Sequence, residues 1–126
     1  MRAAVYCRVS TEDQEREGTS LQTQLEACLG YCEQKGYQIA RRFSETYSGL
    51  TLERPKLTEL RDLIRANEID VVVVYCLDRI SRDPTHGVIL TQELENYNIT
   101  LEAVTETVEY RPGQANKLHS WLRFKA

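Results

Sequence analysis

The most apolar stretch of this chain, residues 69–77, reads Ile-Asp-Val-Val-Val-Val-Tyr-Cys-Leu and is rich in β-branched side chains. A strand in the middle of a parallel sheet has this composition, because helices cover both of its faces and leave no polar side exposed to water. The stretch therefore predicts a central parallel strand, and it constrains the fold more strongly than any other segment.

Strand-like segments alternate with helix-like segments around this run. The expected strands lie at residues 3–9, 37–43, 69–77 and 99–105. Residues 44–54 show no clear period and are expected to form a loop. The alternation predicts an α/β fold, a three-layer sandwich with helices on both faces of a mostly parallel sheet of four or five strands.

Three helices are expected between these strands, beginning near Thr19, at Pro55 and at Pro84. The start of the first is open, because Thr11 with Gln14 fits the capping-box pattern as well as Thr19 with Gln22. Gly36 is placed to end this helix. Each proline suits the first turn of its helix, where a backbone N–H is not needed.

Composition limits the class of protein. With 126 residues, 41% hydrophobic and 28% charged, the chain suits one soluble domain. No apolar run could span a membrane, and the start shows no secretion signal, so a cytoplasmic location is expected. The net charge of −3 argues against coating nucleic acid by bulk electrostatics. It leaves room for an enzyme that handles one phosphate with local arginines.

Four cysteines stand at positions 7, 28, 32 and 76. None has a CxxC spacing, and the chain holds two histidines, so a zinc site is not expected. Free thiols, most of them buried, are the preferred interpretation.

Two segments carry the chemistry, each at the expected end of a strand. Residues 6–14 read Tyr-Cys-Arg-Val-Ser-Thr-Glu-Asp-Gln, and residues 77–83 read Leu-Asp-Arg-Ile-Ser-Arg-Asp. Arg8 lies two positions before Ser10, on the same side of an extended strand. Arg79 and Arg82 are three apart and share a face of a helical turn. If the two strand ends are neighbours, three guanidinium groups converge near Ser10.

Arginines bind phosphate oxygens in a bidentate way, and neither segment contains a histidine to act as a base for serine. The combination suits attack on a phosphodiester better than attack on an acyl group. A plainer interpretation stays open for each residue. Ser10 is a possible helix cap, and Arg8 a possible partner of Asp78 or Asp83. Gln24 fits an ordinary helix surface, and Arg54 fits a loop ion pair with Glu53 or Glu45.

Taken together, the motifs resemble the catalytic domain of the serine recombinases, the resolvase/invertase family. The resemblance covers residues 1 to about 110, in order, and rests on Tyr6, Arg8, Val9, Ser10, Thr11, Gln14, Ser48, Gly49, Arg54 and the segment 77–83. Residues 17–24 are more similar to the large serine recombinases, which include phage integrases.

The resemblance implies a site-specific DNA recombinase. Ser10 would attack the scissile phosphate and form a 5′-phosphoserine link, with Arg8, Arg79 and Arg82 stabilising the transition state. Asp78 would orient an arginine or assist proton transfer, and the base remains open between Asp78 and Asp83 by position. The supporting positions would be Gln14, Gln24, Ser48, Arg54 and Asp83. The partner would be double-stranded DNA, no metal or other cofactor would be needed, and the full-length protein would act as a homodimer or homotetramer.

The last 16 residues, 111–126, are expected to begin an amphipathic helix that is cut short. In the resemblance this helix drives oligomerisation, and a DNA-binding region follows it. The expected division is a catalytic domain at 1–110 and the start of the helix at 111–126. Two other functions stay open: a serine/arginine phosphate-ester hydrolase, and a flavodoxin-like module that binds a phosphate or a nucleotide.

Overall fold

The computed structural model describes residues 1–9, 20–46, 54–80, 84–105 and 108–110, and the structural statements below concern these residues. The elements in chain order are β1 (Arg2–Val9), α2 (Leu21–Lys35), β2 (Gln38–Thr46), α3 (Pro55–Arg65), β3 (Val71–Val74), the 3-10 turn η1 (Leu77–Arg79), α4 (Pro84–Asn96), β4 (Thr100–Ala103) and β5 (Val108–Tyr110).

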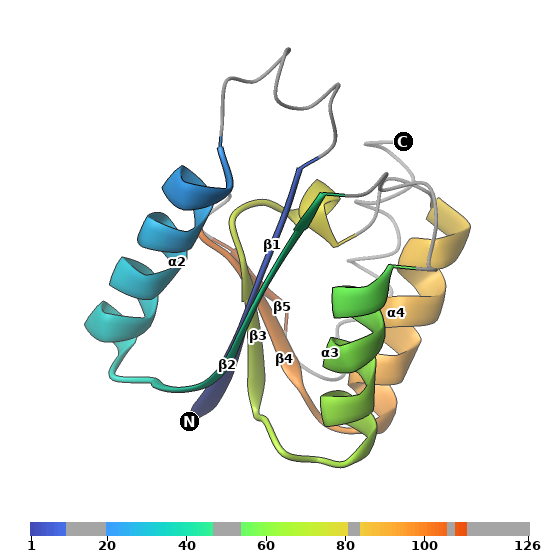
Figure 1. Ribbon diagram of the computed structural model, residues 1–126. Helices are drawn as coiled ribbons and strands as arrows, with labels where there is room; N and C mark the ends of the chain where they lie inside the picture. Colours follow the sequence, from blue (N-terminus) through green and yellow to red (C-terminus); the bar gives the residue numbers. More distant parts are fainter. Residues whose placement is uncertain (10–19, 47–53, 81–83, 106–107, 111–126) are drawn as a thin grey trace.

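The five strands form one sheet in the order β2-β1-β3-β4-β5. The pairs β1–β2, β1–β3 and β3–β4 are parallel, and β5 runs antiparallel to β4 at the edge. Helix α2 covers one face, and α3 and α4 cover the other (Figure 1). This confirms the predicted three-layer α/β sandwich with a mostly parallel sheet.

The central strand is β3, where the apolar run predicted it. All four of its valines are fully buried, because Val71 and Val73 face α2 while Val72 and Val74 face α3 and α4. The regular strand is shorter than the run: it ends at Val74, and Leu77 is buried in η1 instead. The length of this apolar run therefore indicates how many residues are buried, and the regular strand is shorter.

Two element boundaries differ from the sequence-based expectation. Strand β2 continues to Thr46, so residues 44–46 are strand and not loop. Helix α2 is capped by Ser20, whose hydroxyl accepts a hydrogen bond from the Thr23 N–H at 3.1 Å, so the cap is one residue after Thr19. Its predicted end is confirmed: Gly36 takes the left-handed conformation, with φ of 74°, that a side chain would disfavour.

Pro55 occupies the first turn of α3, as predicted. Asp83, which precedes the helix expected at Pro84, and the C-terminal segment 111–126 lie outside the described residues. In the part of the chain that the structure describes, no helix is long and apolar enough to cross a membrane. Three of the four cysteines, at positions 7, 28 and 32, are fully buried and free, as expected, and Cys76 is partly exposed.

Candidate active site

Three arginine side chains are fully buried at the carboxyl ends of the central strands. Arg8 lies near the end of β1, Arg79 ends the turn η1 after β3, and Arg54 immediately precedes α3; each has 0% exposure. Because β1 and β3 are neighbours, their carboxyl ends meet, which is the condition on which the expected convergence of the arginines depended. Such an edge is where open parallel sheets place their ligand sites.

Backbone carbonyls of η1 hold the arginines together. Arg8 Nε donates to the Arg79 carbonyl at 3.1 Å, and Arg54 Nη1 donates to the same carbonyl at 3.4 Å. Arg54 Nη2 donates to the Ile80 carbonyl at 2.5 Å. These carbonyls hold the guanidinium groups of Arg8 and Arg54 beside η1. Three fully buried arginines therefore lie together at one place.

Gln24 of α2 fixes the backbone beside Arg8. Its amide nitrogen donates to the Arg8 carbonyl at 3.1 Å, and its amide oxygen accepts from the Arg8 N–H at 3.3 Å. Gln24 is fully buried, so it is not an ordinary surface position of its helix. The pairing of β1 with β3 stops at Tyr6 opposite Val74, two residues earlier. On the β3 side Gln24 thus takes the place of a strand partner for Arg8, while β2 pairs with β1 as far as Val9.

Arg54 forms no ion pair with Glu45, one of the two partners considered for it, and the other, Glu53, lies outside the described residues. The Arg54 guanidinium carbon lies 5.6 Å from the centre of the Tyr6 ring, a cation–π contact. Burial lowers the pKa of Arg54 from its usual value, but an arginine remains charged at neutral pH. Burial also raises the pKa of the Tyr6 phenol well above its usual range, although the charge of Arg54 opposes the shift, so Tyr6 stays protonated.

Sequence reasoning did not assign a site role to Glu45, and it used Tyr6 only as part of a motif. The Glu45 carboxylate accepts a short hydrogen bond from the Tyr6 hydroxyl, and it accepts the N–H groups of Lys56 at 2.9 Å and Leu57 at 3.1 Å. A signal was present, because Glu45 is two residues after the apolar Phe43 and so shares its buried face. Helix α3 also begins without a good capping residue.

The other predicted residues have partial or no structural description. Asp78 lies within η1, between Leu77 and Arg79, and its side chain is outside the described part. The remaining candidates outside the described residues are Ser10, Gln14, Ser48, Arg82 and Asp83. The structure thus brings together Arg8, Arg79, Arg54 and Gln24 from the predicted set.

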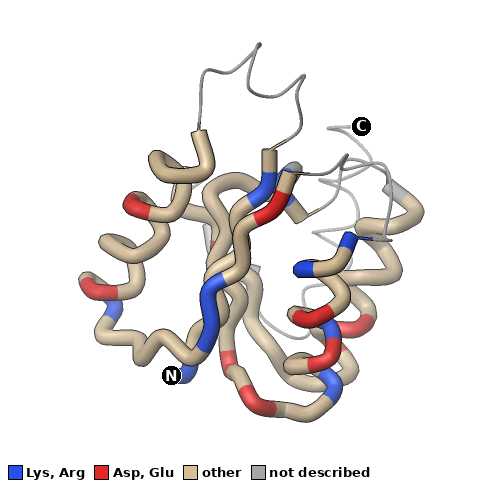
Figure 2. Tube along the Cα trace, in the orientation of Figure 1, with Lys and Arg blue, Asp and Glu red and all other residues tan. Residues whose placement is uncertain are grey.

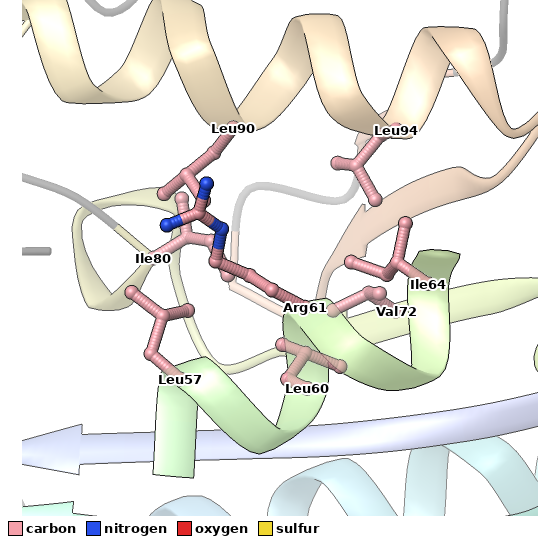
Figure 3. A pocket seen from close by; sticks show the side chains of 8 residues that line it. All are labelled: Leu57, Leu60, Arg61, Ile64, Val72, Ile80, Leu90 and Leu94. Atoms are coloured by element: carbon pink, nitrogen blue, oxygen red, sulfur yellow. The ribbon is translucent and has the colours of Figure 1, made fainter. Parts of the chain in front are cut away.

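A pocket between α3 and α4 differs from the arginine cluster in the chemistry of its lining. It is lined by apolar side chains, with Arg61 as its one charged lining residue (Figure 3). Arg61 Nε and Nη2 both donate to Glu93 Oε2, at 3.1 and 2.8 Å. The one charged group of the pocket is therefore already paired, and we interpret the pocket as imperfect packing between two helices.

The arginine cluster, rather than bulk charge, suits the binding of an anion. Figure 2 shows basic and acidic positions interspersed along the described chain, in keeping with its net charge of −3. Arginines of fixed charge, pre-positioned and shielded from water, stabilise charge that develops on phosphate oxygens. The fold and site define a class: α/β proteins with a cluster of buried arginines at the carboxyl ends of a mostly parallel sheet.

Comparison with known proteins identifies the family. Residues 3–120 match the resolvase N-terminal domain, and the chain belongs to this family. A putative DNA recombinase of Bacillus subtilis (strain 168) is 39% identical over 98 residues, which are 78% of this chain and 19% of that protein. The transposon Tn917 resolvase of Enterococcus faecalis is 35% identical over 104 residues, 82% of this chain and 50% of the relative. The chain thus spans half or less of these relatives.

Comparison with solved structures leads to the same family. The N-terminal catalytic domain of TP901-1 integrase superposes with a TM-score of 0.82 at 28% identity, covering 98% of this chain and 93% of that one. The C-terminal catalytic domain of ISC1926 TnpA, an IS607-like serine recombinase, gives a TM-score of 0.72 at 28% identity, with 82% of this chain and 70% of that one covered. The predicted family resemblance is confirmed.

Proposed function

We propose that this chain is the catalytic part of a serine site-specific DNA recombinase. The observation that carries the proposal is the meeting of three fully buried arginines, Arg8, Arg54 and Arg79, at the ends of β1 and β3. Membership of the resolvase N-terminal domain family and the similarity to recombinase catalytic domains support it.

In the proposed reaction the Ser10 hydroxyl oxygen attacks the scissile phosphorus. The bond from phosphorus to the deoxyribose 3′ oxygen breaks, which leaves a 3′ hydroxyl and a 5′-phosphoserine link. Arg8, Arg79 and Arg82 stabilise the charge on the phosphate oxygens, and Asp78 orients an arginine or assists proton transfer. The reverse attack by a 3′ hydroxyl on the new strand rejoins the DNA, so the phosphodiester energy is conserved.

The supporting positions in this proposal are Gln14, Gln24, Ser48, Arg54 and Asp83. Gln24 and Arg54 support it best, because Gln24 holds the Arg8 backbone and Arg54 shares its carbonyl acceptor with Arg8. Double-stranded DNA as substrate, a dimeric or tetrameric assembly of the full-length protein, and a cytoplasmic location belong to the same proposal.

The test is to trap the cleaved complex of the full-length protein with DNA that flanks its own gene. After tryptic digestion, a nucleotide adduct on the peptide 9–16 is expected at Ser10. Ser10→Ala should abolish the adduct and cleavage, while the neighbouring Thr11→Ala leaves the adduct on Ser10. Bound DNA without any adduct would contradict the proposal, and so would cleavage retained in Ser10→Ala. Release of phosphate from a small ester would instead support the hydrolase alternative.

A further inference from the structure

We propose that Cys7 and Cys28 are a redox pair, which a hydroperoxide converts to a disulfide and which slows DNA cleavage when it is oxidised. The effect on cleavage rests on the recombinase function proposed above, whereas the disulfide can be detected independently of it. Both cysteines are free and fully buried, and they lie in the same apolar cluster between the sheet and α2. The proposed cleavage reaction uses neither thiol.

The first step is the contact between the two thiols. Cys7 lies on β1 and Cys28 on α2, and the Cys28 thiol donates a hydrogen bond to the Cys7 sulfur. A disulfide requires two cysteines whose side chains point at each other across a short distance, and a hydrogen-bonded pair meets that condition. Cys32 lies one turn further along α2 in the same cluster and provides an internal comparison.

The second step concerns which thiol reacts. Cys7 also accepts a hydrogen bond from the hydroxyl of Ser44, its register partner on β2. The bond from Cys28, together with that from Ser44, lowers the pKa of the Cys7 thiol, although burial opposes the shift. The bond to Cys7 and burial raise the pKa of Cys28, which keeps its proton. Cys7 is therefore the nucleophile, because the thiolate reacts and the thiol does not.

The third step concerns access, since a buried thiol in apolar surroundings is usually inert. Cys7 differs from such a thiol because Ser44, which contacts its sulfur, is exposed on the edge strand β2. A local opening of that edge would admit a molecule as small as hydrogen peroxide. Transient disulfides of this kind also suit the proposed cytoplasmic location, where redox-sensing pairs occur.

The reaction uses one hydroperoxide and both thiols. The Cys7 thiolate attacks an oxygen of hydrogen peroxide, the O–O bond breaks and hydroxide leaves, so Cys7 becomes a sulfenic acid. The Cys28 sulfur then attacks the Cys7 sulfur, the S–O bond breaks, and the departing hydroxide takes the Cys28 proton. In total the two thiols lose two electrons and two protons, and the peroxide is reduced to two molecules of water.

The last step connects the pair to the arginine cluster. Cys7 directly precedes Arg8, and Cys28 lies one turn after Gln24, whose amide bonds the Arg8 backbone at 3.1 and 3.3 Å. A covalent bond between two sulfur atoms is much shorter than a hydrogen-bonded contact between two thiols. Its formation therefore draws α2 and β1 together beside Gln24 and displaces the Arg8 backbone.

A measurement without DNA tests the disulfide. The full-length protein is treated with hydrogen peroxide, its remaining thiols are alkylated, and it is digested with trypsin. Peptides 3–8 and 17–35 should be joined with the loss of two hydrogens, and dithiothreitol should separate them. Because peptide 17–35 contains both Cys28 and Cys32, the matched control Cys32→Ala should still form the cross-link, whereas Cys28→Ala should not. A wild-type protein without this cross-link, or a cross-link that survives in Cys28→Ala, would overturn the proposal.

The role of Ser44 is tested by the rate of cross-linking. Ser44→Ala removes a hydrogen-bond donor from Cys7 and keeps both cysteines, so the cross-link should form several-fold more slowly, as the thiolate fraction falls. The matched control is Thr46→Ala, which removes another exposed hydroxyl from the same strand and should leave the rate unchanged. Equal rates in Ser44→Ala and wild type would overturn the assignment of Cys7 as the nucleophile.

A measurement with DNA tests the effect on cleavage. Peroxide should lower the single-turnover cleavage rate of the full-length protein about 10- to 100-fold, the cost of a small misplacement near the reacting atoms, and dithiothreitol should restore it. Cys28→Ala should cleave at the same rate before and after peroxide, and Cys32→Ala should remain sensitive. Full cleavage by cross-linked wild type, or sensitivity retained in Cys28→Ala, would overturn the effect on cleavage.

Two outcomes outside the redox pair remain distinguishable. If the cavity left by Cys28→Ala prevents folding, Cys7→Ala tests the other partner and should be equally insensitive to peroxide. If the reduced wild-type protein forms no serine–DNA link, the recombinase function fails, and the joined peptides still decide whether Cys7 and Cys28 form a redox pair.

Discussion

Two buried charged clusters lie on opposite faces of the same sheet, and they are built differently. On the α3/α4 side, Arg8, Arg54 and Arg79 gather at the carboxyl ends of the strands. On the α2 side, Glu102 of β4 is also fully buried, opposite Val73 in the sheet. Burial of a charge is costly unless polar partners compensate, so each cluster requires an explanation.

The carboxylate is enclosed by hydroxyl donors. Tyr31 donates to Glu102 Oε1 at 2.5 Å, and Tyr37 donates to its two oxygens at 3.0 and 2.7 Å. This cluster joins α2 and the turn after it to β4, and it needs no ligand to be satisfied. The arginine cluster instead brings three guanidinium groups together at the carboxyl ends of the strands, where we propose that a phosphate binds. Under this proposal the buried carboxylate is structural and the buried arginines are functional.

The largest expected effect tests the arginine cluster. Arg79→Met keeps the length of the side chain and removes the charge, and it should lower the single-turnover cleavage rate about 10²- to 10³-fold, the loss typical of one transition-state donor. The melting temperature should fall far less than the cleavage rate, because methionine keeps the apolar part of this fully buried side chain. The control Arg61→Met removes an arginine that pairs with Glu93 and should leave cleavage unchanged. A melting temperature that falls as steeply as activity would make Arg79 a structural residue.

For the buried carboxylate of Glu102 we expect a loss of stability without a loss of cleavage. Glu102→Leu leaves the hydroxyls of Tyr31 and Tyr37 without their acceptor, which should lower the free energy of unfolding by about 1–3 kcal/mol. Glu102→Gln retains an acceptor and should cost less. Cleavage per folded molecule should stay at the wild-type level in both variants, measured well below their melting temperatures. A selective loss of cleavage in Glu102→Gln would remove the contrast between the two clusters.

The fold was predictable from the sequence because buried segments and helix ends have characteristic residues. The apolar run located β3, Gly36 marked the end of α2, and Pro55 marked the start of α3. Arg8 and Arg79 could be placed near each other only on the condition that β1 and β3 are neighbours, which the structure supplies. Features that depend on local pattern are therefore accessible from the order of residues alone.

The partners of the site residues were not accessible in the same way. Gln24 could equally have been a surface residue, since its helical position does not reveal that its amide bonds the Arg8 backbone. The capping of α3 by Glu45 joins segments that an apparent loop separates, and no local rule predicts it. Glu102 looked like an ordinary strand residue, because its two tyrosine partners come from α2 and the turn that follows it.

An exposed ion pair completes the comparison and should have the smallest effect. The Arg2 guanidinium bonds the Asp70 carboxylate at 3.1 Å, and the Arg2 backbone N–H bonds it at 2.8 Å, with both side chains well exposed. These hydrogen bonds hold the pKa of Asp70 below its usual value. Asp70→Asn should lower the free energy of unfolding at neutral pH by about 0.2–1 kcal/mol, the range for exposed pairs.

The pH dependence has a definite sign. Because the pKa of Asp70 is lower in the folded than in the unfolded chain, its stabilising contribution is complete above the unfolded pKa of about 4. The contribution is lost as the pH falls through the folded pKa, so wild type and Asp70→Asn should converge in acid, and also draw closer in about 1 M salt, which screens exposed charges. Urea unfolding at several pH values measures this. A difference that persisted in acid would show that Asp70 acts through packing rather than charge, unlike either buried cluster.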